Sequence, residues 1–147
     1  MAEKGRTVLV VDDDPAILEV VLALVDHLGY EAVGVDCGLE AFILIKESPE
    51  RFHLLLTDWQ MKELDGMDLA RLVSLSRYVR GEPRIPMVLM TGPEVTEEML
   101  ADAGFCASLK KPFTVEELEG VLDTAFGVRA PVSIAANVYD AAGRGQD

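Results

Sequence analysis

The sequence is poor in cysteine and contains no long apolar run. Its two cysteines, Cys37 and Cys106, form no C-x-x-C pair, and no cluster of histidines accompanies them. The small number and wide spacing of the cysteines predict two buried free thiols in a cytosolic protein. No apolar run approaches the ~18 residues of a membrane span, and the short polar segment before Thr7 does not have the pattern of a signal peptide. We therefore expect a cytoplasmic protein without membrane insertion.

Basic residues are also scarce, with 13 lysines and arginines against 26 aspartates and glutamates and a net charge of -13. A nucleic-acid interface needs a basic face that replaces the counterions of the phosphates, and an anionic lipid surface also attracts basic segments. The charge balance therefore argues against direct binding to nucleic acid or anionic lipid. It favours a cation as ligand, or a basic patch on a protein partner.

The apolar residues follow a regular alternation along the chain. The length of 147 residues and a hydrophobic fraction of 50% suit one domain with a substantial core. Short apolar runs predict strands buried on both faces of a parallel sheet, and the amphipathic segments between them predict helices on both sides. This (βα)5 alternation predicts a doubly wound α/β fold, and we expect the common flavodoxin-like strand order 2-1-3-4-5. The predicted strands are 7–11, 31–35, 54–57, 86–90 and 107–110, and the predicted helices are 15–28, 39–47, 67–80, 96–103 and 114–126.

Local signals mark several helix ends. Asp14 precedes Pro15 as a cap, Thr114 and Glu117 have the spacing of a capping box, and Gly29 ends the first helix. These signals support the predicted boundaries.

The residues after the last predicted helix have no strong period. We expect a domain over residues 1–127 and a C-terminal tail over residues 128–147 that is too short for an output domain. Part of the tail is expected to pack on the domain through Val132, Ile134, Val138 or Tyr139.

Polar residues follow the strands at their carboxyl ends, where open α/β sheets bind ligands. Asp12 and Asp13 follow the first strand, Asp58 the third, Thr91 the fourth and Lys111 the fifth. Converging carboxylates repel one another unless a hard cation such as Mg²⁺ lies between them. A hydroxyl and an ammonium group would complete a clamp for phosphoryl oxygens, and an aspartate can accept a phosphoryl group.

These motifs, in this order, resemble the receiver domain of two-component response regulators, especially the stand-alone, chemotaxis-type members. The resemblance covers about residues 5–126. It is carried by Val-Val-Asp12-Asp13-Asp14-Pro15, by Leu-Leu-Leu-Thr-Asp58-Trp59-Gln60-Met61 with Asp65-Gly66, by Met-Thr91-Gly92 and by Lys111-Pro112-Phe113.

The resemblance implies a role for each strand-end residue. Asp58 is the implied phosphoacceptor, while Thr91 and Lys111 would each hold a phosphoryl oxygen. The implied ligands of Mg²⁺ are Asp13 and Asp58, with Asp12 acting through water and Gln60 through its backbone carbonyl.

The resemblance also implies partners. The phosphoryl donor would be a phosphohistidine on a sensor histidine kinase or a phosphotransfer protein, and the output would pass to a downstream protein. The chain would catalyse only its own phosphorylation and slow dephosphorylation, so we expect a switch protein rather than an enzyme.

Three features depart from the family pattern. Lys62 stands where proline is usual, and Ser108 occupies the place of an aromatic switch residue. The segment between Thr91 and Lys111 is short, which predicts a shortened or irregular fourth helix.

Two alternatives remain open. The departures allow a degenerate receiver that binds partners without phosphoryl transfer. The spacing of Asp12 and Asp14 also matches a phosphatase of the haloacid dehalogenase type, although Ala16 and the short chain disfavour it. A receiver would be phosphorylated on Asp58, and such a phosphatase on Asp12.

Three further polar or aromatic residues are expected to have no catalytic role. His27 and His53 join none of the strand-end residues and are interpreted as structural. Trp59 is expected to be partly exposed near the site.

Overall fold

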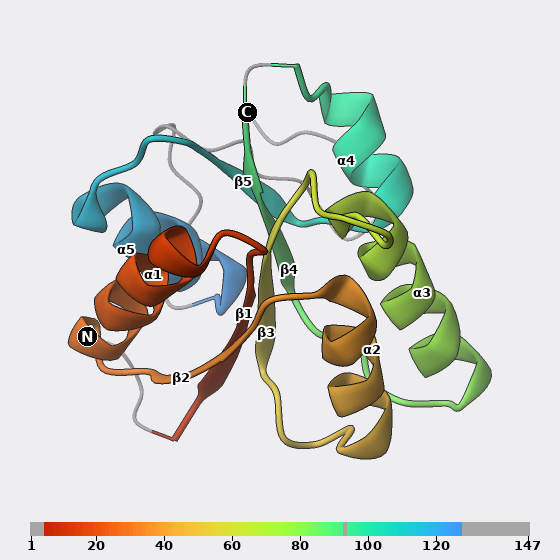
Figure 1. Ribbon diagram of the computed structural model, residues 1–147. Helices are drawn as coiled ribbons and strands as arrows, with labels where there is room; N and C mark the ends of the chain where they lie inside the picture. The colour runs from red at the N-terminus through yellow and green to blue at the C-terminus, as the bar shows by residue number, and fades with distance from the viewer. Residues whose placement is uncertain (1–4, 93, 128–147) are drawn as a thin grey trace.

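A five-stranded parallel sheet lies between two layers of helices in the computed structural model, which describes residues 5–92 and 94–127 (Figure 1). The strand order is β2-β1-β3-β4-β5, and every neighbouring pair is parallel. The predicted fold class and strand order are confirmed. The strands are β1 (Thr7–Val11), β2 (Glu31–Val35), β3 (Leu54–Asp58), β4 (Met87–Thr91) and β5 (Ala107–Lys110).

The helices cover both faces of the sheet, with α1 and α5 on one side and α2, α3 and α4 on the other (Figure 1). Their ends differ from the predicted ones by no more than one residue, because capping residues such as Thr96 and Thr114 lie only half within the helix. The expected short fourth helix is confirmed. The helices are α1 (Pro15–His27), α2 (Gly38–Glu47), α3 (Gly66–Val79), α4 (Glu97–Ala103) and α5 (Val115–Ala125).

Strand β1 lies inside the sheet, between β2 and β3, and its sequence is apolar because both of its faces are buried. Successive side chains of a strand point to opposite faces of the sheet. Val8 and Val10 join the core under α1 and α5, whereas Leu9 and Val11 join the core under α2, α3 and α4. All four are fully buried. The two cores hold β1 between them and fix the position of the residues that follow it.

The predicted capping signals are present. The carboxylate of Asp14 accepts two backbone N–H groups from the first turn of α1. The Thr114 N–H donates to Glu117 Oε1 at 2.9 Å, and the Glu117 N–H donates back to Thr114 Oγ1 at 3.1 Å. Gly29, just after α1, has φ +97°, a conformation that favours glycine.

The cysteines are free, as predicted, but both are partly exposed rather than fully buried. Cys37 Sγ accepts the Glu40 N–H at 3.3 Å and caps α2, a position at the surface end of a helix. The structural role expected of His53 is confirmed, since its Nδ1 accepts the Thr7 N–H at 2.9 Å and joins the starts of two strands.

Two expectations concern the membrane and the tail. Among the described helices, none combines the length and the apolar character that crossing a bilayer requires. The tail residues expected to pack on the domain, Val132, Ile134, Val138 and Tyr139, lie outside the described part of the chain.

Tyr30 directly precedes β2 and lies in the core next to α5. Its side chain is 4% exposed, and its ring stacks on that of Phe126 with centroids 5.2 Å apart. Burial, together with the negative charge of Asp123, raises the pKa of Tyr30 to about 12 from an ordinary value of 10.0. The folded protein therefore holds the phenolic proton more tightly than the unfolded chain.

This difference predicts alkaline sensitivity. The free energy of unfolding should fall as the pH rises from 10.0 towards about 12, because the unfolded chain releases the Tyr30 proton first. The Tyr30→Phe variant should lose this part of the slope, measured by chemical denaturation across that range. Tyr78→Phe is the matched control, since Tyr78 is 84% exposed. Equal slopes in the wild type and Tyr30→Phe would contradict the prediction.

Candidate functional site

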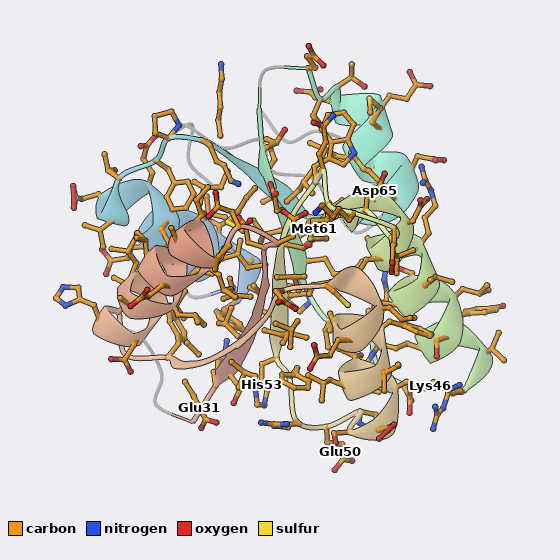
Figure 2. All side chains as sticks on the ribbon, in the orientation of Figure 1. Glu31, Lys46, Glu50, His53, Met61 and Asp65 are labelled. Atoms are coloured by element: carbon orange, nitrogen blue, oxygen red, sulfur yellow. The ribbon has the colours of Figure 1, made fainter. Side chains whose placement is uncertain are left out.

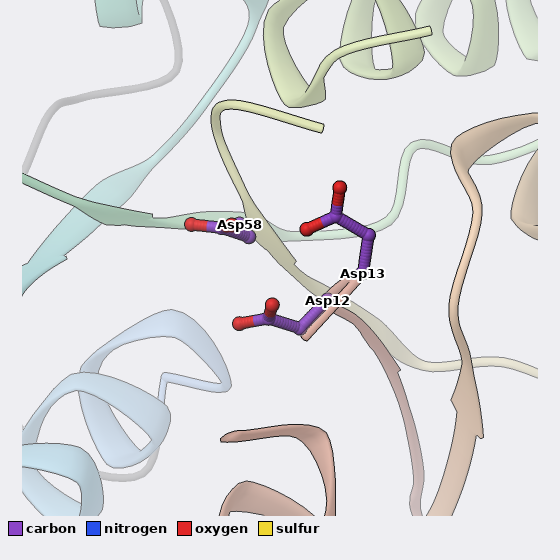
Figure 3. Close-up of side chains that lie close together, drawn as sticks. All are labelled: Asp12, Asp13 and Asp58. Atoms are coloured by element: carbon purple, nitrogen blue, oxygen red, sulfur yellow. The ribbon is translucent and has the colours of Figure 1, made fainter. Parts of the chain in front are cut away.

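Three carboxylates meet at the carboxyl ends of β1 and β3, which are neighbours in the sheet (Figure 3). Asp12 and Asp13 follow β1, and Asp58 is the last residue of β3. One oxygen from each lies within 4.8 Å of the others. The ends of parallel strands bring these residues together although 45 positions separate Asp13 from Asp58 in the sequence. Clustered carboxylate oxygens are the donors that Mg²⁺ prefers.

Lys111 brings a positive charge to this cluster from the loop after β5. Its Nζ lies 2.9 Å from Asp58 Oδ1 and 3.2 Å from Asp12 Oδ2. The strand order places β4 between β3 and β5, so the lysine side chain reaches across the end of β4. The peptide bond between Lys111 and Pro112 is cis. One ammonium group offsets only part of the charge of three carboxylates, which leaves the cluster able to attract a divalent cation.

The ion pair changes the acidity of both partners. Burial raises the pKa of Asp58, and the opposing effect of the Lys111 ammonium does not cancel this shift. Burial would lower the pKa of Lys111, but the hydrogen bond and negative charge of Asp58, together with Asp12, outweigh it and raise that pKa. Lys111 is therefore held as an ammonium ion. The ionised form of Asp58 is destabilised by burial, and a further positive charge nearby would stabilise it.

Asp12 is the most firmly held of the three carboxylates. Asp12 is 0% exposed to solvent. Its Oδ1 accepts the Asp14 N–H at 3.0 Å, and its Oδ2 faces Lys111. Because both oxygens already have protein partners, Asp12 is oriented by the fold before any ligand arrives.

The loop after β3 contributes a hydrogen bond that depends on the unusual Lys62. The Lys62 N–H donates to Asp13 Oδ2 at 3.2 Å. A proline at this position would have no N–H to donate. The departure from the family pattern therefore supplies a backbone contact that orients Asp13, while the Lys62 side chain is exposed.

Thr91 and Gln60 are near the cluster in the fold but are not bonded to it. Thr91 ends β4 and is buried, and its hydroxyl donates to the Gly92 carbonyl at 2.8 Å. Gln60 lies exposed in the loop that directly follows β3. Within residues 5–92 and 94–127, no hydrogen bond joins either residue to the three carboxylates. The structure therefore brings together Asp12, Asp13, Asp58 and Lys111.

Asp65-Gly66, one of the motifs that carry the resemblance, also contacts the site, which the sequence pattern does not reveal. Asp65 caps α3 by accepting the Asp68 N–H at 2.9 Å. Gly66 begins α3, and a Cβ on it would lie 2.2 Å from the carbonyl oxygen of Asp58. Only a glycine permits this close approach, so Gly66 helps to place the end of β3. The signal in the sequence is a glycine just after an N-cap residue, which by itself does not reveal the partner.

Ser108 is the second departure from the family pattern, and Trp59 is the tryptophan expected near the site. Ser108 is buried in β5 and pairs with Leu89 of β4, so both face the layer of α2, α3 and α4. A small hydroxyl therefore fills the place where an aromatic ring is usual. Trp59 is partly buried against the same core, as expected for a residue near the site.

Comparison with known proteins agrees with this geometry. The family model described as the response regulator receiver domain matches residues 8–123, which include the three carboxylates and Lys111. The chain belongs to the response regulator receiver domain family. The membership agrees with the resemblance seen in the sequence and with the five-stranded fold.

Individual relatives show how far the similarity extends. The rice (Oryza sativa subsp. indica) two-component response regulator ORR22 is 30% identical to this receiver over 119 residues. The match covers 80% of this chain but only 16% of ORR22, so the chain spans a small part of that relative.

Two solved structures share the fold. The receiver domain of the sensor histidine kinase PA1611 from Pseudomonas aeruginosa PAO1, with a magnesium ion coordinated in its active-site cleft, is 27% identical with a TM-score of 0.70. The match covers 84% of this chain and 98% of that one. The receiver domain of Ssk1 from Saccharomyces cerevisiae, crystallised with the phosphotransfer protein Ypd1, is 19% identical with a TM-score of 0.76, over 90% of this chain and 96% of the other. This second similarity concerns the fold alone.

Proposed function

We propose that this receiver domain is a phosphorylation switch in which Asp58 accepts a phosphoryl group from a phosphohistidine. The observation that carries the proposal is the Lys111 ammonium held between Asp58 and Asp12, beside the third carboxylate of Asp13. A carboxylate oxygen of Asp58 would form the new bond to phosphorus as the bond to the histidine nitrogen breaks. The donor histidine keeps the electron pair of that broken bond.

Each neighbour has a proposed role in this transfer. Lys111 would move from the Asp58 carboxylate to an oxygen of the incoming phosphoryl group and balance its charge. The Thr91 hydroxyl would exchange its Gly92 acceptor for another phosphoryl oxygen. Each of these movements replaces one hydrogen-bond acceptor with a more negative one, which favours the phosphorylated state.

The carboxylates fit a magnesium ion. Asp13 and Asp58 would hold it directly, Asp12 through water, and Gln60 through its backbone carbonyl. When bound, Mg²⁺ supplies charge neutralisation between the carboxylates and the phosphoryl oxygens. The magnesium in the PA1611 receiver, which is 27% identical to this chain, supports the assignment.

Signalling in this proposal passes through protein contacts. A sensor histidine kinase or phosphotransfer protein supplies the phosphoryl group, and an unidentified downstream protein responds to it. The chain acts in the cytoplasm, in keeping with its free cysteines, and catalyses only its own phosphorylation and dephosphorylation. The division into a receiver over residues 1–127 and a tail over residues 128–147 remains a prediction.

The phosphatase alternative has less support. It requires Asp12 as nucleophile, but this residue is fully buried and both of its oxygens are engaged. Membership of the receiver family also disfavours it. A binding module without phosphoryl transfer is favoured by Ser108 alone, because the buried hydroxyl cannot act as an aromatic switch.

Intact-mass measurement with Mg²⁺ and a small phosphodonor tests the proposal. The wild type should gain one labile phosphoryl adduct, and Asp58→Asn should gain none. Asp14→Asn is the matched control, since Asp14 is an exposed acid beside the site that caps α1. An adduct that persists in Asp58→Asn, or a folded wild type that gains none, would overturn the assignment.

Fluorescence gives an independent readout of the same site. Trp59 follows Asp58 directly and is the only tryptophan. Mg²⁺ with beryllium fluoride, which mimics a phosphoryl group, should change its emission in the wild type but not in Asp58→Asn. A binding module without a phosphoryl site would give no change in either protein.

A further inference from the structure

A pocket lies at the opposite end of the sheet from the carboxylate cluster. It has a volume of about 430 Å³ and is lined by the segments that precede β1, β3 and β4, together with Phe126 after α5. Figure 2 shows His53 and Glu50 at this lower end of the molecule, far from Met61 and Asp65 near the other end. The pocket is thus separate from the proposed phosphorylation site.

The pocket contains a buried arginine without a carboxylate partner. Arg77 is 5% exposed. Its Nε donates to the Pro83 carbonyl, and its Nη1 donates to the Pro49 carbonyl at 3.1 Å. No carboxylate of the described residues forms an ion pair with it. Carbonyl dipoles orient the guanidinium but do not neutralise its charge, so Arg77 remains a buried cation that would gain from an anion.

One nitrogen of Arg77, Nη2, has no hydrogen-bond partner within the described part of the chain. Among the described residues, Tyr30 Oη is the sole fully buried side-chain N or O atom without a hydrogen-bond partner. Nη2 also lacks a partner, so it cannot be fully buried. It therefore reaches solvent, and Arg77 lines this pocket. A ligand in the pocket would find N–H donors of a fixed, charged group.

Three more donors line the same space, namely Arg6, Arg84 and His53. Arg84 is exposed at the pocket wall and forms no ion pair with any described carboxylate. His53 uses Nδ1 to accept the Thr7 N–H, so its proton is on Nε2, which can donate. The one carboxylate in the wall is Glu50. In a chain with a net charge of -13, this local excess of cationic groups is unusual.

The remaining wall is largely apolar. Phe52 and Phe126 both line the pocket, along with Ile85 and three prolines. An occupant that covers these surfaces needs an apolar body as well as a negative group. Pockets of this size, with a few converging polar groups on an apolar wall, are typical of sites for small molecules.

We propose that this pocket binds a small organic anion. Its carboxylate or phosphate group contacts Arg77 and Arg84, and its apolar body lies against Ile85 and Pro86, which are only partly buried. Arginine is suited to this role because its planar N–H groups match carboxylate and phosphate oxygens. Binding needs neither Mg²⁺ nor phosphorylation, since none of the carboxylates of the cluster lines the pocket.

The test is an NMR titration of the full chain with phenyl phosphate, with EDTA present so that no divalent cation holds the probe at Asp58. Saturable shifts at the backbone amides of His53 and Ile85, and at the Arg77 side-chain Nε–H, are expected at millimolar concentration. Inorganic phosphate lacks the apolar body and benzyl alcohol lacks the charge, so both should bind more weakly. Shifts confined to the residues around Asp58, or no saturable shift, would overturn the proposal.

Variants separate specific binding from general attraction by positive charge. Arg84→Gln should weaken phenyl phosphate binding about tenfold, the loss expected for one charge-assisted contact. Arg80→Gln is the matched control, because Arg80 is exposed near the end of α3, pairs with Glu82 and does not line the pocket. Arg84 is exposed, so its replacement should leave the fold intact. Equal affinities of Arg84→Gln and Arg80→Gln for the probe would refute the site.

Discussion

Replacing Lys111 with methionine should lower the free energy of unfolding by about 2 kcal/mol when no divalent cation is present. The variant leaves the carboxylates of Asp12 and Asp58 without their shared cation, and Asp12 is fully buried. Removing one partner of a buried ion pair costs about 3–5 kcal/mol. We expect a smaller loss because the Lys111 side chain is 26% exposed and water can reach the site.

Magnesium should reverse much of this loss. A divalent cation supplies the charge that the variant lacks, and a ligand that binds only the folded state stabilises it. The difference between wild type and Lys111→Met, measured by urea denaturation at neutral pH, should therefore shrink when EDTA is replaced by saturating Mg²⁺. A gap that is the same in both conditions would show that Lys111 and the cation do not act on the same carboxylates.

The neighbouring lysine provides the control for this experiment. Lys110 is exposed at the end of β5 and forms no ion pair within the described residues. Lys110→Met removes the same charge from the chain and should change stability by less than about 0.5 kcal/mol. Similar losses in both variants would point to net charge rather than to the ion pair.

Replacing Gly66 with alanine should be the second strongly destabilising change, with a loss of about 3 kcal/mol. The added Cβ would lie 2.2 Å from the Asp58 carbonyl oxygen and 3.1 Å from Leu89 Cδ1. Since the nearest atom belongs to the backbone of β3, relief requires the strand end or the start of α3 to move. Overpacking of this kind typically costs about 1–3 kcal/mol, and contact with a backbone atom places this case at the upper limit.

The same substitution should also disturb the candidate functional site. A shift of the Asp58 backbone moves its carboxylate away from Lys111 and Asp13, so Mg²⁺ should bind more weakly, as followed by Trp59 fluorescence. Gly92→Ala is the matched control for stability, because a Cβ there meets no heavy atom within 4 Å. Unfolding of Gly66→Ala at the same urea concentration as Gly92→Ala would contradict the clash.

The residues that hold the candidate site together also contribute to stability at this end of the sheet. Three carboxylates gather there against their mutual repulsion, and a lysine from the far side of β4 holds two of them. Gly66 then lets α3 begin directly against the carbonyl of the phosphoacceptor candidate. The arrangement costs electrostatic energy in the free protein, which a bound cation can offset.

The fold was largely predictable because its signals are local. The apolar run from Thr7 to Val11 requires burial on both faces, and the alternation with amphipathic segments requires helices on both sides of the sheet. The caps at Asp14 and Thr114 also depend only on residues within the next turn. The burial expected for Cys37 was wrong, because its place at a helix start depends on the surface of the folded molecule.

The convergence of the strand-end residues was predictable for a different reason. Parallel strands end at one edge of the sheet, so Asp12, Asp13 and Asp58 had to lie near one another once the strand order was known. Their functional roles remain predictions. The reach of Lys111 across β4 to two particular oxygens is a property of the structure alone.

By itself, the sequence determined the elements, their order in the sheet and the edge at which the charged residues gather. Only the tertiary structure decided that the Lys62 amide contacts Asp13, that Gly66 touches Asp58 and that Arg77 is buried beside a pocket. The physical reason is the range of the interactions involved. Periodicity and capping act within a few residues, whereas these contacts join segments far apart in the chain and depend on how the side chains and backbone pack.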